Sequence, residues 1–198
     1  MPPISGRFLL RLQDKHADAY QQIRETIQLV SPFFDDFLLE PEEQGNDQVV
    51  RLEWRQKGSR FPFQPWHFSD GTLRFICLAT ALLQPEPPST MLVDEPELGL
   101  HPFALDALAG LFREAAHRGQ LIISTQSAAL LNHFEPNETI VVDREKGASR
   151  FRRLDAVSLA GWLKDFSLGE LWQKNVLDGG PSQVSSMPML TGSPNTLA

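Results

Sequence analysis

Helical repeats and short apolar runs alternate through the middle of the chain, and their order predicts an α/β fold. Apolar residues recur three and four positions apart after Ser69 and again after Pro102, which is the spacing of one helix face. Two short apolar runs, at residues 91–93 and 120–124, are bounded by turn residues and predict buried parallel strands. In chain order the pattern predicts a helix to about Leu83, a strand, a helix that closes near Gly119, a second strand and a short helix at 127–134.

The pattern before Ser69 is less regular. Residues 4–12 mix apolar and basic side chains, which is typical of a strand or of the end of a longer element. A helix capped by Asp14 is predicted to run to about Val30, and the apolar cluster at 33–39 predicts core packing. Residues 40–47 predict an exposed loop, and the alternation over 48–55 predicts a half-buried strand.

The C-terminal part predicts a β-hairpin and two helices. Residues 139–143 and 149–154 flank a glycine-containing turn, which favours a hairpin. Amphipathic spacing predicts helices over 155–166 and 168–177. From Asp178 onward Gly, Pro, Ser and Thr dominate, so residues 178–198 are expected to form a disordered tail.

Composition narrows the class of protein. The 198 residues are 41% hydrophobic and 22% charged, which fits one soluble domain with a small appendage. The lone Cys77 excludes an intrachain disulfide, and the net charge of −7 opposes a broad DNA-coating role. No apolar run reaches the roughly 20 residues that span a bilayer. A cytoplasmic protein without a membrane partner is therefore expected.

Two adjacent carboxylates, Asp94 and Glu95, follow the first predicted strand. Pro96 ends that strand because proline cannot donate to a β-ladder. Ligands of open α/β sheets bind at the carboxyl ends of strands, so one acid can hold hydrated Mg²⁺ and the other can orient or deprotonate a water. This is the pattern of a Walker B motif, whereas the alternative is an ordinary acidic turn.

Polar residues at two further element ends complete a candidate site. Ser69 and Gly71 open a helix, where free backbone N–H groups attract anions and a glycine lets a phosphate approach. Gln126 follows the second strand and has the chemistry to bond a γ-phosphate or an attacking water. A plain helix cap at Ser69 and a strand-end cap at Gln126 remain alternatives.

Together these stretches resemble the heads of ABC-type ATPases, the group that includes the SMC and RecF-like proteins. Residues 68–72 look like the signature motif, 91–95 like Walker B, 98–101 like the D-loop, and 124–127 like the switch, with glutamine where histidine is usual. More closely, residues 73–177 resemble the bacterial AAA_21-type ATPases, which are relatives of the OLD family. The similarity covers roughly residues 7–180.

The resemblance implies the fold, the ligands and the role of each residue. The fold would be the C-terminal lobe of a P-loop NTPase, with parallel strands flanked by helices, a small hairpin and C-terminal helices. ATP and Mg²⁺ would be the cofactors, bound at a head-to-tail dimer with a second ATPase subunit. The implied roles are Mg²⁺ binding for Asp94, general base for Glu95, γ-phosphate sensing for Gln126, and nucleotide or interface contact for Ser69, Asp70, Gly71 and His101.

The resemblance also implies a domain division. Residues 1–66 would be the remnant of an N-terminal or inserted region, 67–177 the ATPase lobe, and 178–198 the tail. The implied biological setting is DNA repair or phage defence, with DNA or a nuclease as a partner.

One part of the family pattern is missing. A P-loop needs a Gly-Lys pair so that backbone N–H groups and the lysine cradle the phosphates, and the sequence contains no such pair. The chain is therefore expected to be inactive alone. Three explanations stay open: a truncated product, a partner that carries the P-loop, or a binding module that has lost activity.

Two other functions compete with an ATPase. The first is a non-catalytic interaction module that docks a partner through residues 155–177. The second is a metal-dependent nuclease, which needs several acids around a metal and finds Glu97 and Asp106 as its nearest extra candidates. The histidines show no metal-ligand spacing; those considered are His67, His101, His117 and His133.

Overall fold

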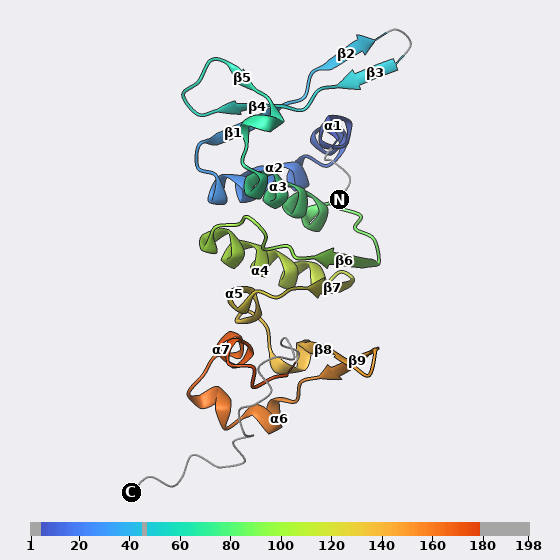
Figure 1. Cartoon of the computed structure of the whole chain (residues 1–198). Coiled ribbons are helices and arrows are strands. Elements are labelled where there is room, and N and C mark those ends of the chain that lie inside the picture. Colours follow the sequence, from blue (N-terminus) through green and yellow to red (C-terminus); the bar gives the residue numbers. More distant parts are fainter. Residues whose placement is uncertain (1–4, 45–46, 179–198) are drawn as a thin grey trace, which may run out of the picture. The chain divides into compact units, whose positions relative to one another are not determined.

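The computed structural model describes residues 5–44 and 47–178 of the chain. These residues form two compact units, one that runs to His133 and one that begins at Phe134. In Figure 1 the first unit is coloured from blue to yellow and the second from yellow to red. None of the helices described is both long enough and apolar enough to span a lipid bilayer.

A stack of helices forms the core of the first unit. Helix α1 packs on α2, α2 packs on α3, and α3 packs on α4 (Figure 1). Ile23 and Leu108 are 0% exposed and Phe75 is 1% exposed, and burying a side chain of this size stabilises the fold by about 1.5–3 kcal/mol. The helices are α1 (Gly6–Lys15), α2 (Ala17–Val30), α3 (Asp70–Leu83), α4 (Pro102–Ala116) and α5 (Ala128–Leu131), with a 3-10 turn η1 (Pro65–His67) before α3.

An antiparallel sheet of β1 (Phe34–Leu38), β4 (Glu53–Gln56) and β5 (Pro62–Phe63) packs beside α2. Its centre is Trp54, which is 2% exposed and stacks on Phe68 with ring centroids 4.1 Å apart. This aromatic contact joins the sheet to the residues immediately before α3.

Helix α2 is also bonded to β1 by polar side chains. The Tyr20 hydroxyl donates to Asp36 at 2.7 Å, and Arg24 forms an ion pair with the same carboxylate at 3.1 Å. Burial raises the pKa of the Tyr20 hydroxyl, and the Asp36 carboxylate raises that pKa further.

The strands β6 (Thr90–Asp94) and β7 (Gln120–Ser124) pair in parallel. Helix α4 connects them and packs on β7, which is the arrangement of a βαβ unit. Leu92 pairs with Ile122, so these two side chains lie on the same face of the sheet. Leu92 is 76% exposed and Ile122 is 49% exposed, so this face is uncovered among the described residues.

The second unit contains the hairpin of β8 (Ile140–Glu145) and β9 (Ala148–Arg153), which pair in antiparallel register. Short helical pieces follow the hairpin. Ser167 caps α7 and its own backbone N–H is bonded by Glu170, which is a complete capping box. The helical pieces are η2 (Pro136–Glu138), α6 (Ala156–Leu159), η3 (Trp162–Lys164) and α7 (Leu168–Gln173).

The predicted pattern from Ser69 to His133 is confirmed in its elements: helix, strand, helix, strand and short helix. The predicted hairpin is confirmed as β8 and β9. The mixed α/β class is therefore correct. The predicted tail lies outside the described residues, except for Asp178.

The predictions for the N-terminal part were partly wrong. Residues 4–12 were expected to be a strand or an element end, but α1 is a helix whose buried face includes Leu9 and Leu12. The helix after Asp14 begins only at Ala17, because the backbone at His16 leaves the helical region with φ −141° and ψ 58°.

One strand prediction and one loop prediction in this part were also wrong. The stretch 48–55 is not one strand, because the chain leaves β3 (Asp47–Val50) after Val50 and enters β4 at Glu53. The expected loop at 40–47 contains β2 (Pro41–Gln44), which pairs with β3. Alternation detects extended backbone, but it does not show that the partner strand changes midway.

The C-terminal helices are shorter than predicted. Residues 155–166 were expected to be one helix but contain α6, a break at Gly161 and η3. The segment 168–177 is helical only to Gln173. Glycine weakens a helix interior, which explains the break. Residues 155–177 therefore contain short helical pieces in place of the helix that the interaction-module hypothesis assumed, and docking through this region stays a prediction.

Candidate functional site

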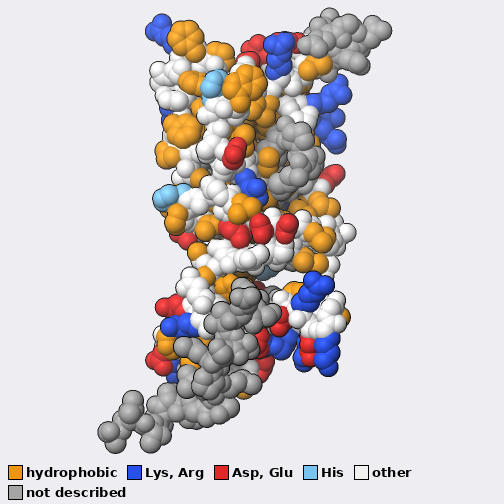
Figure 2. Space-filling view, viewed as in Figure 1, with side chains coloured by type: hydrophobic (Ala, Val, Ile, Leu, Met, Phe, Trp, Pro, Cys, Tyr) orange, Lys and Arg blue, Asp and Glu red, His pale blue; other side chains and the backbone are white. Residues whose placement is uncertain are grey.

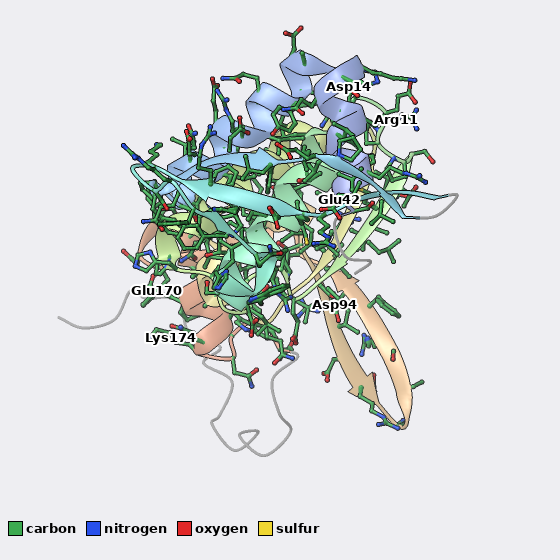
Figure 3. The ribbon with its side chains drawn as sticks, turned by 90° about the horizontal axis from the view of Figure 1, so that it is seen from above. Arg11, Asp14, Glu42, Asp94, Glu170 and Lys174 are labelled. Carbon is green, nitrogen blue, oxygen red and sulfur yellow. The ribbon has the colours of Figure 1, made fainter. Side chains whose placement is uncertain are left out.

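The carboxyl ends of β6 and β7 bring Asp94 beside Ser124. These residues are paired in the parallel register, and the Ser124 hydroxyl donates to the Asp94 carboxylate. Asp94 is the last residue of β6 and is exposed (Figure 3). A carboxylate in this position is accessible to a hydrated cation, as a Mg²⁺ site with mostly water and phosphate ligands requires.

Glu95 has a backbone conformation that is unusual for glutamate. Its φ is +43°, in the left-handed region, which costs of the order of 1–3 kcal/mol for a residue with a side chain. Three hydrogen bonds involve its backbone groups. The Glu95 N–H donates to the Ser124 carbonyl at 2.9 Å, and the Glu95 carbonyl accepts from Arg74 Nη1 at 3.0 Å and from the Leu98 N–H at 3.3 Å. The first residue after β6 is therefore fixed on both sides.

The turn after Glu95 lies directly against the start of α3. A Cβ built on Gly71 would be 1.9 Å from the Gly99 carbonyl oxygen, so only glycine fits there. Gly99 itself has φ +76°, which also favours glycine. The two glycines bring the predicted signature-like segment and the predicted D-loop-like turn into contact.

Ser69 acts as the N-cap of α3 in this structure. Its hydroxyl accepts from the Thr72 N–H at 3.1 Å and lies 2.9 Å from the Thr72 hydroxyl. The capping function that was the alternative for Ser69 is thus confirmed. Asp70 is exposed in the first turn, where a negative charge is favourable next to the helix dipole.

His101 caps the next helix. Its Nδ1 accepts from the Phe103 N–H at 3.2 Å, and Pro102 occupies the first position of α4. His101 is exposed. Its proposed place at a subunit interface stays a prediction.

The residues after β7 are tied to the turn by Glu97. Thr125 donates from its hydroxyl to Glu97 Oε1 at 2.5 Å and accepts from the Ser127 N–H at 2.9 Å. Gln126, between Thr125 and Ser127, is exposed just after the end of β7. The other carboxylate oxygen of Glu97 is buried and has no hydrogen-bond partner among the described residues.

The two extra acids that a nuclease would need are used elsewhere. Glu97 bonds Thr125, and Asp106 lies on α4 with its carboxylate 3.2 Å from His133 Nε2. Within residues 5–44 and 47–178, no group of three or more His, Cys, Asp or Glu side chains is arranged to hold a metal. The geometry thus offers one carboxylate for a cation, Asp94, together with Glu95 next to it.

Arg74 is a neighbour of the site that the motifs did not indicate, and Thr125 lies in the switch-like motif but had no role assigned to it. Arg74 is the one charged residue between Gly71 and Leu83 in the sequence. A lone arginine in an apolar helix needs a partner, and this signal is visible in the sequence itself. Thr125 gave no such signal, because a threonine after a strand is ordinary.

A protein-family model described as "AAA domain, putative AbiEii toxin, Type IV TA system" matches residues 2–132, which is well over half of the chain. The chain belongs to the AAA_21 family. The predicted family is therefore confirmed, and the AAA_21 match extends through α1, the site and α5. No curated protein shows a significant match to the chain.

Solved SMC heads share the fold. A structure from work on "ATP-driven dimerization and DNA stimulated activation of SMC ATPases" superposes with a TM-score of 0.55 at 17% identity, over 82% of this chain and 99% of that one. A SmcHead bound to the C-winged helix domain of ScpA gives 0.59 at 16% identity, over 81% of this chain and 53% of that one. The Pyrococcus furiosus Smc head with an extended coiled coil superposes with a TM-score of 0.60 at 18% identity, over 81% of this chain and 40% of that one.

These comparisons establish the family and the fold. The AAA_21 chain has a mixed α/β fold that resembles an SMC or ABC-type ATPase head, and AAA-type ATPases act on ATP with Mg²⁺. The chain spans about half or less of two of the matched SMC chains. The individual roles of the site residues remain predictions.

Proposed function

We propose that this AAA_21 chain supplies the Walker B, signature and switch residues of an ABC-type ATPase, as its C-terminal lobe. Asp94 holds Mg²⁺ through its hydration shell, and Glu95 orients or deprotonates the attacking water. Gln126 bonds the γ-phosphate or that water. The supporting observation is that the first residue after β6, Glu95, is fixed between β7 and α3 beside an exposed Asp94.

The phosphate cradle would come from polypeptide outside these 198 residues, because the sequence has no Gly-Lys pair. The uncovered face of β6 and β7 supports this proposal. Parallel sheets are normally buried on both faces, yet Leu92 is 76% exposed and Ile122 is 49% exposed. Hydrophobic side chains are visible at the surface of the first unit in Figure 2. A P-loop-bearing segment is the proposed cover of the sheet face.

A second subunit would complete the ATP site on the signature side. Ser69, Asp70 and Gly71 would contact the γ-phosphate of a nucleotide held by that subunit, and His101 would lie at the interface. The support is the exposure of Ser69 and Asp70 at the start of α3, whereas Gly71 is buried against the turn at Gly99. ATP-driven dimerization is described for the SMC ATPases represented by one of the matched structures.

The biological process proposed is phage defence, with DNA repair as the second candidate. The family description refers to a toxin of a type IV toxin–antitoxin system, which favours defence. DNA-stimulated activation is described for the same matched SMC ATPases and supports a DNA or nuclease partner.

ATP turnover by the chain mixed with a P-loop-bearing AAA_21 polypeptide tests this function. Glu95→Gln should lower kcat by roughly 10²–10⁴-fold, the contribution of a general base. Glu114→Gln is the matched control, because Glu114 is an exposed acid on α4, and it should leave turnover unchanged. Equal rates for Glu95→Gln and Glu114→Gln would contradict the proposed role.

A further inference from the structure

Arg74 connects α3 to the site over a long separation in the sequence. It lies in the second turn of α3 and is half-buried, and its Nη1 donates to the carbonyl of Glu95 at 3.0 Å, 21 residues away. A hydrogen bond from a charged donor is about twice as strong as a neutral one. The arginine therefore has a specific backbone target and is not simply a surface charge.

The target is the strained residue of the site. Glu95 has φ +43°, and its N–H continues the β6–β7 pairing by donating to the Ser124 carbonyl. A glutamate without external support would favour the ordinary right-handed or extended regions. The Arg74 bond thus opposes the relaxation of Glu95, together with the Leu98 N–H, which donates to the same carbonyl at 3.3 Å.

A second contact joins the same helix to the same turn. Gly71 is buried, and a Cβ at this position would meet the Gly99 carbonyl carbon at 2.7 Å and its oxygen at 1.9 Å. Helix α3 therefore contacts both ends of the turn. Arg74 contacts Glu95 at the beginning of the turn, and Gly71 contacts Gly99 near its end. A displacement of the start of α3 would be transmitted to Glu95.

We propose that Arg74 is a positioning residue for Glu95. It keeps Glu95 in the left-handed conformation and makes the start of α3 and Glu95 move together. Arg74 touches no reacting atom and acts only through the Glu95 backbone. The consequence for catalysis rests on the proposed function, whereas the conformational claim does not.

Amide exchange and φ-dependent couplings at residue 95, measured by NMR on the full chain without nucleotide, test the conformational claim. Arg74→Met should shift the φ-dependent coupling of residue 95 toward the value for negative φ, because the arginine no longer restrains the carbonyl. It should also speed exchange of the Glu95 amide about tenfold, because the turn opens more often. The same change in a Glu95→Gly background should have little effect, since glycine adopts positive φ without strain. Arg74→Lys should restore part of the protection.

Arg118→Met is the matched control. Arg118 Nη1 also donates to a backbone carbonyl, that of Gln84, at 3.1 Å, but this bond is remote in sequence from Glu95. It should leave the Glu95 amide unchanged. Protection of α4 amides shows whether each variant is folded.

Two results would overturn the proposal: an unchanged Glu95 amide in a folded Arg74→Met variant, or an equal effect of that variant in the Glu95→Gly background. These outcomes are independent of ATP, so they separate failure of the positioning role from failure of the ATPase assignment. If turnover is reconstituted, Arg74→Met should lower kcat while KM stays constant.

Discussion

The helix stack and the β6–β7 sheet have similarly apolar sequences but very different surroundings. Leu108 of α4 is 0% exposed, whereas Leu92 of β6 is 76% exposed. The helices bury their packed faces within the first unit, although Leu29 of α2 and Phe103 of α4 are exposed. The sheet is packed by α4 on β7, and among the described residues nothing covers the face that carries Leu92 and Ile122.

The difference separates residues that stabilise the chain from residues that are available to a partner. An apolar side chain stabilises the fold only through the area that folding removes from water. Leu108 contributes its whole side chain to folding, whereas Leu92, which is 76% exposed among the described residues, contributes little. The exposed apolar face of β6 and β7 is thus the surface on which we propose that the P-loop partner packs.

The largest predicted effect concerns this pair of leucines. Leu108→Ala should lower the free energy of unfolding by roughly 2–5 kcal/mol, because a fully buried side chain leaves a cavity. Leu92→Ala should change it by less than about 0.5 kcal/mol. Urea denaturation of both variants measures the difference, and equal losses would show that the open face is not open in solution.

A second pair of variants tests the contact between α3 and the turn. Gly71→Ala should destabilise the chain by roughly 1–3 kcal/mol, since the new methyl group meets a carbonyl. Gly110→Ala in α4 meets nothing within 4 Å and should stabilise by about 1 kcal/mol through helix propensity. Thermal denaturation compares them. A tolerated alanine at position 71 would mean that the turn moves freely.

Two variants of Ser69 distinguish its role as a helix cap from its proposed role in phosphate binding. Ser69→Ala should cost about 0.5–2 kcal/mol of stability, the usual value of a lost cap. Ser69→Asp should keep the cap and hence the stability, but its negative charge should repel a phosphate. Denaturation and ATP-dependent dimerisation, measured on the chain with its P-loop partner, distinguish the two. Full dimerisation of the aspartate variant would leave Ser69 only its capping role.

The smallest predicted effect lies in the second unit, far in sequence from both regions compared. Hydrogen bonds from Ser167 lower the pKa of Glu170. Because the folded pKa is lowered, the bond stabilises α7 above the ordinary glutamate pKa and is lost as pH falls through the lowered value. An NMR titration of the Glu170 carboxyl should show this low pKa. Ser167→Ala should move it only part of the way toward the ordinary value, because the backbone N–H bond, which is the larger cause, is kept and only the hydroxyl bond is lost. An ordinary glutamate pKa in the unmodified chain would contradict the capping box.

Much of the first unit was predictable from the sequence between Ser69 and His133. Helical spacing and short apolar runs gave α3, β6, α4 and β7, since each element carries its own periodicity. The adjacency of Asp94 and Ser124 followed from the rule that parallel strand ends meet at one edge. These features depend on local patterns and on a simple topology.

The rest depended on tertiary contacts that no local pattern encodes. The strand over 48–55 divides between two sheets because its partners differ, and α1 is helical although its sequence also suited a strand. Glu95 has a left-handed backbone conformation, and its carbonyl accepts a hydrogen bond from Arg74, 21 residues earlier in the sequence. Only the lone charge in α3 indicated that such a partner existed.

Calorimetric titration of ATP·Mg²⁺ tests the central claim most directly. The chain alone should give no binding heat, because the phosphates lack their cradle. Adding a P-loop-bearing AAA_21 polypeptide should produce binding beyond that of the polypeptide alone, and Asp94→Asn should weaken it. Tight binding by the chain alone, or no gain on mixing with the P-loop polypeptide, would contradict the account.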